Sequence, residues 1–237
     1  MSNEQPTLNW INERMTKISH SSWVAVKFQE RISSPGIASM RFCEAVHKAQ
    51  KENLSLSPAN LCCDGARRCF RWLKDSDKEL AQRLSRKTNL DQGVAYGLIK
   101  NVPVLNKNIT EICLGVHIQG DVYISYASPE AVMKMIRNWQ KMTIQNLRVD
   151  ISGIMSVCGN VAVRSYLGQC ISISFGCPDS REYGGIEQDQ LVIGLPYDIA
   201  SKLYGIGGKA KSVDVVKTSM AQCKDSFGDS SEGFGSD

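Results

Sequence analysis

Two cysteine pairs with nearly equal spacing are the feature of this sequence that most constrains its fold. Cys43 and Cys63 have 19 residues between them, and Cys158 and Cys177 have 18. The second cysteine of each pair also begins the same short pattern, Cys-x-x-x-Arg. Matched spacing in the two halves of a chain indicates an internal duplication, in which each half folds in the same way. The alternative is a chance similarity, because the two patterns share few residues.

An internal duplication predicts two related lobes about a pseudo-twofold axis, with the four thiols brought together between them. We expect a first lobe over residues 23–118 and a second lobe over residues 119–208. Within these lobes, residues 23–67 and 121–181 should superpose. A helix over residues 129–143 should then be an insertion in the second lobe.

The two ends of the chain lie outside the predicted lobes. Residues 1–22 carry Leu8, Ile11 and Met15 at helical spacing, which predicts an N-terminal helix. Residues 209–237 are rich in Ser, Gly and Asp, and such a segment buries too little apolar surface to offset the entropy lost on ordering. We therefore expect a disordered, flexible C-terminal tail.

The hydrophobic pattern predicts an α/β (mixed α+β) fold, with mixed sheets and flanking helices. Short apolar or alternating runs predict strands at residues 23–28, 112–118, 121–126, 146–151, 170–175 and 191–195. Apolar residues three or four positions apart predict helices at residues 41–52, 76–105, 129–143 and 197–204.

Cysteine content and charge limit the class of protein. The nine cysteines are an odd number, which argues against a complete set of disulfides. The net charge of +4 is too small to predict a nucleic-acid surface. No run approaches the ~18 apolar residues of a membrane span, and the N-terminus has no signal-peptide pattern. We therefore expect a cytoplasmic protein without a membrane partner, in which reduced cysteines bind metal or react.

Six stretches of the sequence resemble the domain of unknown function family 169, whose members are found widely in archaea and anaerobic bacteria. The stretches are VAVKF at 24–28, RFCEAVHKA at 41–49, LSPANLCCDGAR at 56–67, SVCGNV at 156–161, FGCPDSREYGG at 175–185 and QLVIGLPYD at 190–198. Together they cover most of residues 23–205. The resemblance implies membership of this family, and it implies no established activity.

The resemblance also separates candidate ligands from other cysteines. The family pattern has cysteines at the positions of Cys43, Cys63, Cys158 and Cys177. It sets five cysteines apart from the candidate ligands: Cys62, Cys69, Cys113, Cys170 and Cys223. Of these, Cys62 is a substitute ligand candidate because it is next to Cys63. The chain departs from the family pattern at Asp179, where the family usually has glycine, and this departure bears on the local turn more than on the thiol.

Four cysteine thiolates are the usual ligands of an iron–sulfur cluster, and they also bind structural zinc. Neither pair has the short spacing of a zinc ribbon, so a [4Fe–4S] cluster is the expected cofactor and zinc is the alternative. We expect the cluster between the lobes, with each ligand beside a turn or a helix start. Arg67 and Arg181 end the two Cys-x-x-x-Arg patterns, and they are the cofactor-binding candidates that would offset the negative charge of the cluster.

Three functions are compatible with this site. The first is an iron–sulfur protein of anaerobic metabolism, which exchanges electrons with a redox protein partner or activates a small ligand. The second is a thiol-dependent enzyme that transfers sulfur or an acyl group through Cys63 or Cys177. The third is a zinc-stabilised interaction module. The sequence identifies no catalytic residue, and it fixes neither enzymatic activity nor the oligomeric state.

Overall fold

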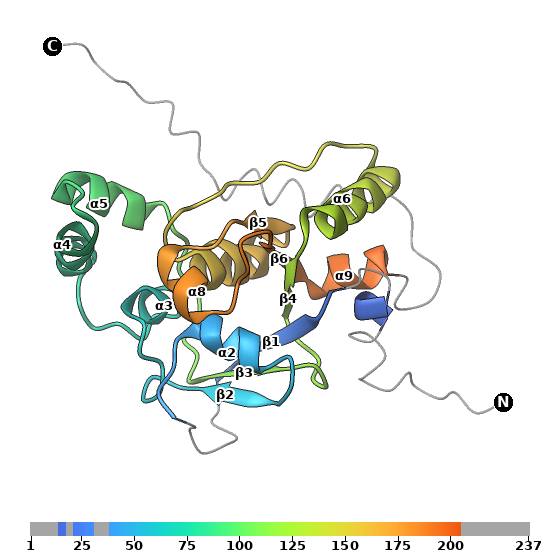
Figure 1. Cartoon of the computed structure of the whole chain (residues 1–237). Helices are drawn as coiled ribbons and strands as arrows, with labels where there is room; N and C mark the ends of the chain where they lie inside the picture. Colours follow the sequence, from blue (N-terminus) through green and yellow to red (C-terminus); the bar gives the residue numbers. More distant parts are fainter. Residues whose placement is uncertain (1–13, 18–20, 31–37, 205–237) are drawn as a thin grey trace, which may run out of the picture.

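A computed structural model describes residues 14–17, 21–30 and 38–204 of the chain. In this part, a sheet of six strands lies between helices on its two faces (Figure 1). Residues 14–17 are helical, and the rest of the predicted N-terminal helix lies outside the described residues. The predicted tail, residues 209–237, lies outside them as well, and so does Cys223.

The six strands form one sheet in which neighbouring strands are antiparallel. The strands are β1 (Trp23–Gln29), β2 (Leu54–Leu56), β3 (Glu111–Gly115), β4 (Val122–Ala127), β5 (Ser172–Ser174) and β6 (Leu191–Pro196). Their order across the sheet is β2-β3-β1-β4-β6-β5. The predicted mixed sheets are thus corrected to a single antiparallel sheet, because β1 and β4, one from each predicted lobe, pair directly.

Helices fill most connections between the strands. They are α2 (Phe42–Lys48), α3 (Asp64–Cys69), α4 (Asp77–Thr88), α5 (Gln92–Lys100), α6 (Pro129–Thr143), the π-helix η1 (Ser156–Val163), α7 (Arg164–Gly168), α8 (Pro178–Tyr183) and α9 (Tyr197–Leu203). The helix α6 has its predicted bounds and begins at the N-cap Ser128. The predicted helical region 76–105 is instead two helices. The backbone is left-handed at Asn89 (φ 56°), and α5 starts again after its N-cap Asp91.

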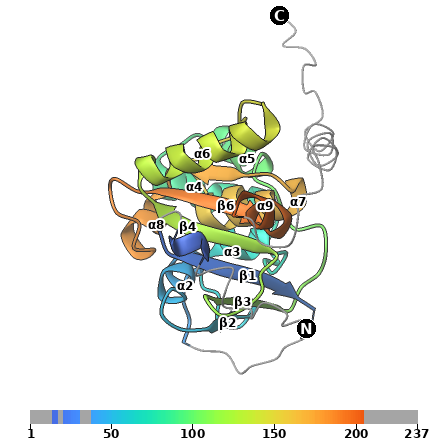
Figure 2. The same cartoon turned by 90° about the vertical axis from the view of Figure 1, so that its right-hand side faces the viewer.

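Alternating side chains give the sheet two apolar faces, and helices cover both of them. On β1, Val24 and Val26 belong to one core, whereas Trp23 and Ala25 belong to the other. The first core includes side chains of α2, α3 and η1, and the second includes side chains of α6 and α9. Figure 2 views the sheet from the side on which α6 and α9 lie. The candidate cysteines lie on the side of the first core.

One predicted strand is absent from the described structure, and one observed strand was not predicted. Residues 146–151 alternate in polarity, but they are mostly exposed and form no strand. A strand needs a neighbour to satisfy its backbone N–H and C=O groups, and no described strand pairs with this segment. Conversely, β2 pairs with β3 at the edge of the sheet, although its three residues are too few for alternation to be recognised.

The strand order has the same pattern in both halves of the chain. The strands β1 and β4 pair at the centre, β3 and β6 flank them, and the three-residue strands β2 and β5 lie at the edges. In each half, the helix that contains the first cysteine comes between the central and the edge strand. A six-residue helix capped by the second cysteine follows the edge strand. A duplication predicts this arrangement, and both the superposition of the halves and the lobe boundaries stay predictions.

An ion pair between α3 and α4 gives a first testable prediction. The Arg68 guanidinium is 8% exposed and contacts the Asp77 carboxylate at 2.7 and 3.1 Å, and it also donates to the Val102 C=O at 2.9 Å. We expect Asp77→Asn to lower the free energy of unfolding by about 1–3 kcal/mol, because the change leaves a buried cation without its counter-charge. Urea denaturation at neutral pH measures this loss.

The pH dependence of the same variant provides a second readout. The hydrogen bond from Arg68 lowers the pKa of Asp77. The contribution of the Arg68–Asp77 pair to the free energy of unfolding is therefore fully present above the ordinary aspartate pKa of about 3.9. It is lost as the pH falls through the lower pKa that Asp77 has in the folded state. The difference between wild type and Asp77→Asn should shrink in acid. Asp75→Asn is the matched control, because the Asp75–Arg83 pair is over 40% exposed on both sides and should contribute little.

Candidate functional site

Cys43 lies in the first turn of α2 and belongs to the first core. Its backbone C=O accepts a hydrogen bond from Tyr126 Oη on β4 at 3.0 Å, which ties the start of α2 to the centre of the sheet. Gly184, at the end of α8, packs directly on this cysteine. A Cβ at Gly184 would lie 2.8 Å from Cys43 Cβ and 3.3 Å from its Sγ. Glycine therefore allows α8 to approach the Cys43 thiol closely.

Cys63 and Cys177 occupy equivalent positions as the N-caps of α3 and α8. Both have extended backbone, and both side chains are half-buried. The Ala66 N–H, in the first turn of α3, hydrogen-bonds Cys63 and acts to lower its pKa. The Cys177 N–H donates to Ser180 Oγ at 2.7 Å in the first turn of α8. The prediction that neither thiol lies inside a regular element is confirmed.

Cys158 is the third residue of η1 and so lies in the first turn of this π-helix, close to a helix start as predicted, and all residues of the π-helix are buried. The wide turn is visible in the hydrogen bond from the Asn160 N–H to the Met155 C=O at 3.0 Å, which spans five residues. Met155 itself precedes the helix with a left-handed backbone (φ 47°). Single π-turns within helices recur at functional sites, so the unusual geometry at Cys158 is a signal that the sequence pattern could not provide.

The four candidate thiols interact electrostatically, although they come from distant parts of the chain. Burial first, and then the charges of Cys177 and Cys63, raise the pKa of Cys43 to about 12. A hydrogen bond with Cys69 and burial raise the pKa of Cys158 well above its ordinary value, and the charges of Cys63 and Cys177 add to this effect. Such interactions weaken with distance, so the structure brings the four cysteines into one neighbourhood.

Two residues that sequence reasoning missed belong to the same neighbourhood. Burial raises the pKa of Tyr126 well above its ordinary value, and the charges of Cys43, Cys177 and Cys158 contribute. Arg41, the N-cap of α2, has a charge that acts to lower the pKa of the Cys63 thiol. Its guanidinium carbon lies 4.3 Å from the centre of the Tyr183 ring on α8. Arg41 begins the stretch RFCEAVHKA and lies two residues before Cys43, which is the signal that could have identified it. Tyr126 belongs to none of the quoted stretches, and only the fold places it near the thiols.

The arginines predicted from the sequence have other contacts. Arg181 donates to the backbone C=O groups of Glu187 and Gln190, and so it fastens the loop that follows α8. Arg67 Nε is buried without a hydrogen-bond partner in the described structure, and Arg67 is not among the main influences on the Cys63 pKa. Their roles as cofactor-binding residues stay predictions, whereas Arg41 is the cation that acts on a candidate thiol.

Asp179, the departure from the family pattern, lies in the first turn of α8 with a helical backbone. It forms ion pairs with Lys87 and, at 3.9 Å, with Arg41. Its negative charge also raises the pKa of Cys63. Replacing glycine at this position therefore leaves the helix start intact and adds a charge that Lys87 and Arg41 balance.

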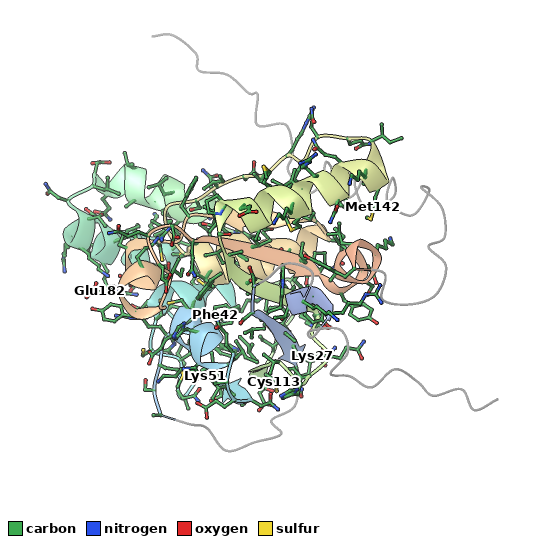
Figure 3. The ribbon with its side chains drawn as sticks, turned by 45° about the vertical axis from the view of Figure 1, so that its right-hand side comes forward. Lys27, Phe42, Lys51, Cys113, Met142 and Glu182 are labelled. Carbon is green, nitrogen blue, oxygen red and sulfur yellow. The ribbon has the colours of Figure 1, made fainter. Side chains whose placement is uncertain are left out.

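Three of the remaining cysteines lie away from this neighbourhood or face solvent. Cys62 is exposed, and Cys170 is half-buried immediately before β5. Cys113 lies on β3 with Gln29 Nε2 3.4 Å from its Sγ. Figure 3 shows Cys113 among the strands, well apart from Glu182 on α8, the helix that Cys177 caps. The role of Cys62 as a substitute ligand stays a prediction.

The side chains do not form a finished metal site. Among residues 14–17, 21–30 and 38–204, no three His, Cys, Asp or Glu side chains are placed to hold one metal ion. The donor set nevertheless fits a soft metal, because the four candidate cysteines are free thiols. Each cysteine has one side-chain torsion with three staggered positions, so shared ligation would require some thiols to rotate inward.

Comparisons with known proteins gave one match. A model of the family DUF169, described as Uncharacterised ArCR, matches residues 19–205 of the chain. No curated protein and no solved structure matches the chain. The matched region includes all four candidate cysteines together with Arg41 and Tyr126. In the described part of the chain, the helices are too short or too polar to cross a membrane.

Proposed function

The chain belongs to the domain of unknown function family 169, as its sequence predicted, and from this premise we propose that it is an iron–sulfur protein. The proposed ligands are Cys43, Cys63, Cys158 and Cys177, and the proposed cofactor is a [4Fe–4S] cluster. Its proposed role is electron transfer or activation of a small ligand in anaerobic metabolism. The observation that carries the proposal is that Cys43 and Cys158 lie in the first core, that Cys63 packs against this core, and that Gly184, at the end of the helix that Cys177 caps, packs on Cys43.

The raised pKa values support a site that is completed by a cation. Burial and neighbouring thiols raise the pKa of Cys43, Cys63 and Cys158, so these groups are protonated at neutral pH when no metal is bound. Protonated thiols are uncharged, so bringing several of them together does not stabilise the fold electrostatically. A metal that replaces the protons would bind the resulting thiolates and offset the repulsion between their charges, and its binding would release protons.

The surroundings also suit a negatively charged cluster. A cysteine-ligated [4Fe–4S] cluster carries a net negative charge in common oxidation states, which nearby cations and N–H groups stabilise. Arg41 lies close enough to act on Cys63, and the Ala66 N–H points to the same thiol. Cys43 and Cys158 are buried, whereas Cys63 and Cys177 are half-exposed. A cluster held by all four would therefore have a protected side and a side open to a redox partner or a small ligand.

The two alternative functions receive less support. A nucleophilic cysteine is normally activated by a lowered pKa, but the pKa of Cys63 is raised, chiefly by burial. A zinc-stabilised module would use the same four thiols. The spacing of these cysteines along the sequence is, however, unlike that of a zinc ribbon. Zinc and iron–sulfur sites with identical ligands differ in metal content and in spectrum, so measurement decides between them.

The test is anaerobic purification followed by cluster reconstitution with iron and sulfide. We expect about four iron and four sulfide per chain, a brown colour, and a Mössbauer spectrum of a [4Fe–4S] cluster. Iron, sulfide and zinc are measured on the same sample, both before and after reconstitution. Expression with iron-enriched medium under anaerobic conditions shows whether the cluster is present without reconstitution.

Each other outcome contradicts the proposal in a defined way. A colourless protein with one zinc per chain, unchanged by reconstitution, would establish the zinc module instead. A protein that takes up neither metal, yet loses a thiol stoichiometrically to an alkylating substrate analogue, would favour the thiol enzyme. Folding is checked in every sample by circular dichroism, so that failure to bind metal is not confused with failure to fold.

A further inference from the structure

A second group of sulfur atoms lies behind the proposed ligands. Cys69, at the end of α3, is fully buried, and its Sγ lies 3.8 Å from Met155 Sδ. Cys69 is also the largest cause of the raised pKa of Cys158 on η1, so the two thiols interact. Cys69, Met155 and Cys158 thus form a buried group of three sulfur atoms, which we name the sulfur triad. The sequence had given Cys69 and Met155 no functional role.

Two glycines make room for the sulfur triad. A Cβ at Gly159 would lie 2.9 Å from Cys69 Sγ, and a Cβ at Gly65 would lie 2.9 Å from Met155 Cγ and 3.7 Å from its Sδ. The two distances of 2.9 Å are too short for a real side chain without movement of Cys69 or Met155, and a Cβ at Gly159 would also clash with Val102 Cγ1. Any larger residue at Gly65 or Gly159 would push these side chains apart. The close approach of α3 to η1 is therefore built around the triad.

The chemistry and spacing of the triad match those of ligands to a soft monovalent metal. Thiolate and thioether sulfur prefer copper(I) among biological metals. Two sulfur ligands at the usual metal–thiolate length of about 2.3 Å from one ion are about 3.8–4.0 Å apart, which agrees with the Cys69–Met155 separation of 3.8 Å. Met155 and Cys158 are three positions apart at the start of η1, so a single turn supplies two of the three sulfurs.

We propose that Cys69, Met155 and Cys158 form a binding site for copper(I). The ion would bind the two cysteine sulfurs and the thioether in a three-coordinate arrangement and would displace the thiol protons as the sulfurs become ligands. The charge of the Arg68 guanidinium interacts with that of Cys69, so a positive charge lies near the resulting thiolate. Burial of all three side chains keeps water from the ion. No electron is transferred in this step, because copper enters and remains as copper(I).

The sulfur triad and the proposed iron–sulfur site share Cys158. A metal bound at one site would therefore use a ligand that the other site needs. Copper(I) bound to the triad is therefore expected to lower the iron content of the reconstituted protein. The two sites can nevertheless be separated by mutation. Met155 and Cys69 belong to the triad alone, whereas Cys43 and Cys177 belong to the four-cysteine site alone. Copper binding does not require that the proposed iron–sulfur function be correct.

The experiment is anaerobic titration of the reduced, metal-free full-length protein with copper(I), in competition with a chromogenic copper(I) chelator. We expect one tightly bound ion per chain, and X-ray absorption should show sulfur ligands only. Met155→Leu should weaken binding by about tenfold or more, since it removes one ligand at nearly constant volume. Cys69→Ser should weaken it by more. Cys113→Ser is the matched control and should bind as wild type does.

The variants also distinguish this proposal from the iron–sulfur proposal. Met155→Leu should keep the iron content of the wild type, and the double variant Cys43→Ser/Cys177→Ser should keep copper(I) affinity. If Met155→Leu does not fold, Cys69→Ser alone decides. Equal copper(I) affinity in wild type and Cys69→Ser would overturn the proposal. So would loss of affinity only in the Cys43→Ser/Cys177→Ser variant, because copper would then occupy the outer cysteines.

Discussion

In Cys43→Ala or Cys177→Ala, the iron content after anaerobic reconstitution is expected to fall from about four atoms per chain to less than half of that value. Each proposed ligand binds one iron of the cluster, and replacing it with alanine leaves that iron without a protein donor. The two cysteines come from different halves of the chain and differ in burial. If one cluster is shared between the halves, both single variants should lose iron to a similar extent.

The controls for this prediction are Cys113→Ala and Cys170→Ala. Both cysteines are half-buried free thiols, as Cys177 is, so these variants remove the same atom from a comparable environment. We expect them to retain the iron and sulfide content of wild type. An equal loss of iron in Cys113→Ala would show that most of the iron binds nonspecifically to thiols. Full retention of iron in Cys177→Ala would show that Cys177 is not a ligand. Iron and sulfide assays on the folded, gel-filtered proteins give these values.

The double variant Cys43→Ala/Cys177→Ala tests whether the ligands act on one cluster. A shared cluster that is already lost in the single variants leaves little further iron to lose, so the effects should be far from additive. Two independent sites would lose iron in two equal steps. The Mössbauer spectrum adds a second criterion. A residual cluster with three protein ligands would have one distinct iron, and this is the form that binds a small molecule.

Much of the fold could be predicted because its central elements have strong periodicity. The strand β4 alternates between the two cores, and α6 has both a capping serine and a regular apolar stripe. The elements that were missed depend on context instead. The three residues of β2 become a strand only because β3 lies beside them. The helix break at Asn89 depends on a left-handed backbone conformation, which the sequence pattern does not predict.

The candidate site was predictable only in part, for a related reason. Spacing and resemblance identify Cys43, Cys63, Cys158 and Cys177, because repeated cysteines leave a pattern along the chain. Contacts between distant segments leave no such pattern. Tyr126 reaches the Cys43 backbone across 83 positions, and Cys69 meets Met155 across 86. These residues could be found only once β4 was placed under α2 and α3 was placed against η1.

The free energy of unfolding is expected to fall by about 3–5 kcal/mol in Phe70→Ala, because the change leaves a large cavity in the first core. Phe70 is fully buried directly after α3, the helix that begins at Cys63. Its ring lies 5.0 Å from that of Phe42, 5.7 Å from that of Trp72 and 6.0 Å from that of Phe28 (centroid distances). This cluster therefore joins β1, α2 and α3, and urea denaturation of the reduced, metal-free protein measures its contribution.

Phe175→Ala is the matched control, since it removes the same ring from a side chain that is 57% exposed beside Cys177. We expect it to change the free energy of unfolding by no more than about 0.5 kcal/mol. A loss below about 1 kcal/mol in Phe70→Ala would mean that the core collapses to fill the cavity, contrary to this prediction. Because Phe70 supports the helix that carries both Cys63 and Cys69, Phe70→Ala should also weaken binding of iron and copper(I). Phe175→Ala should weaken neither, because its ring supports no helix in the core.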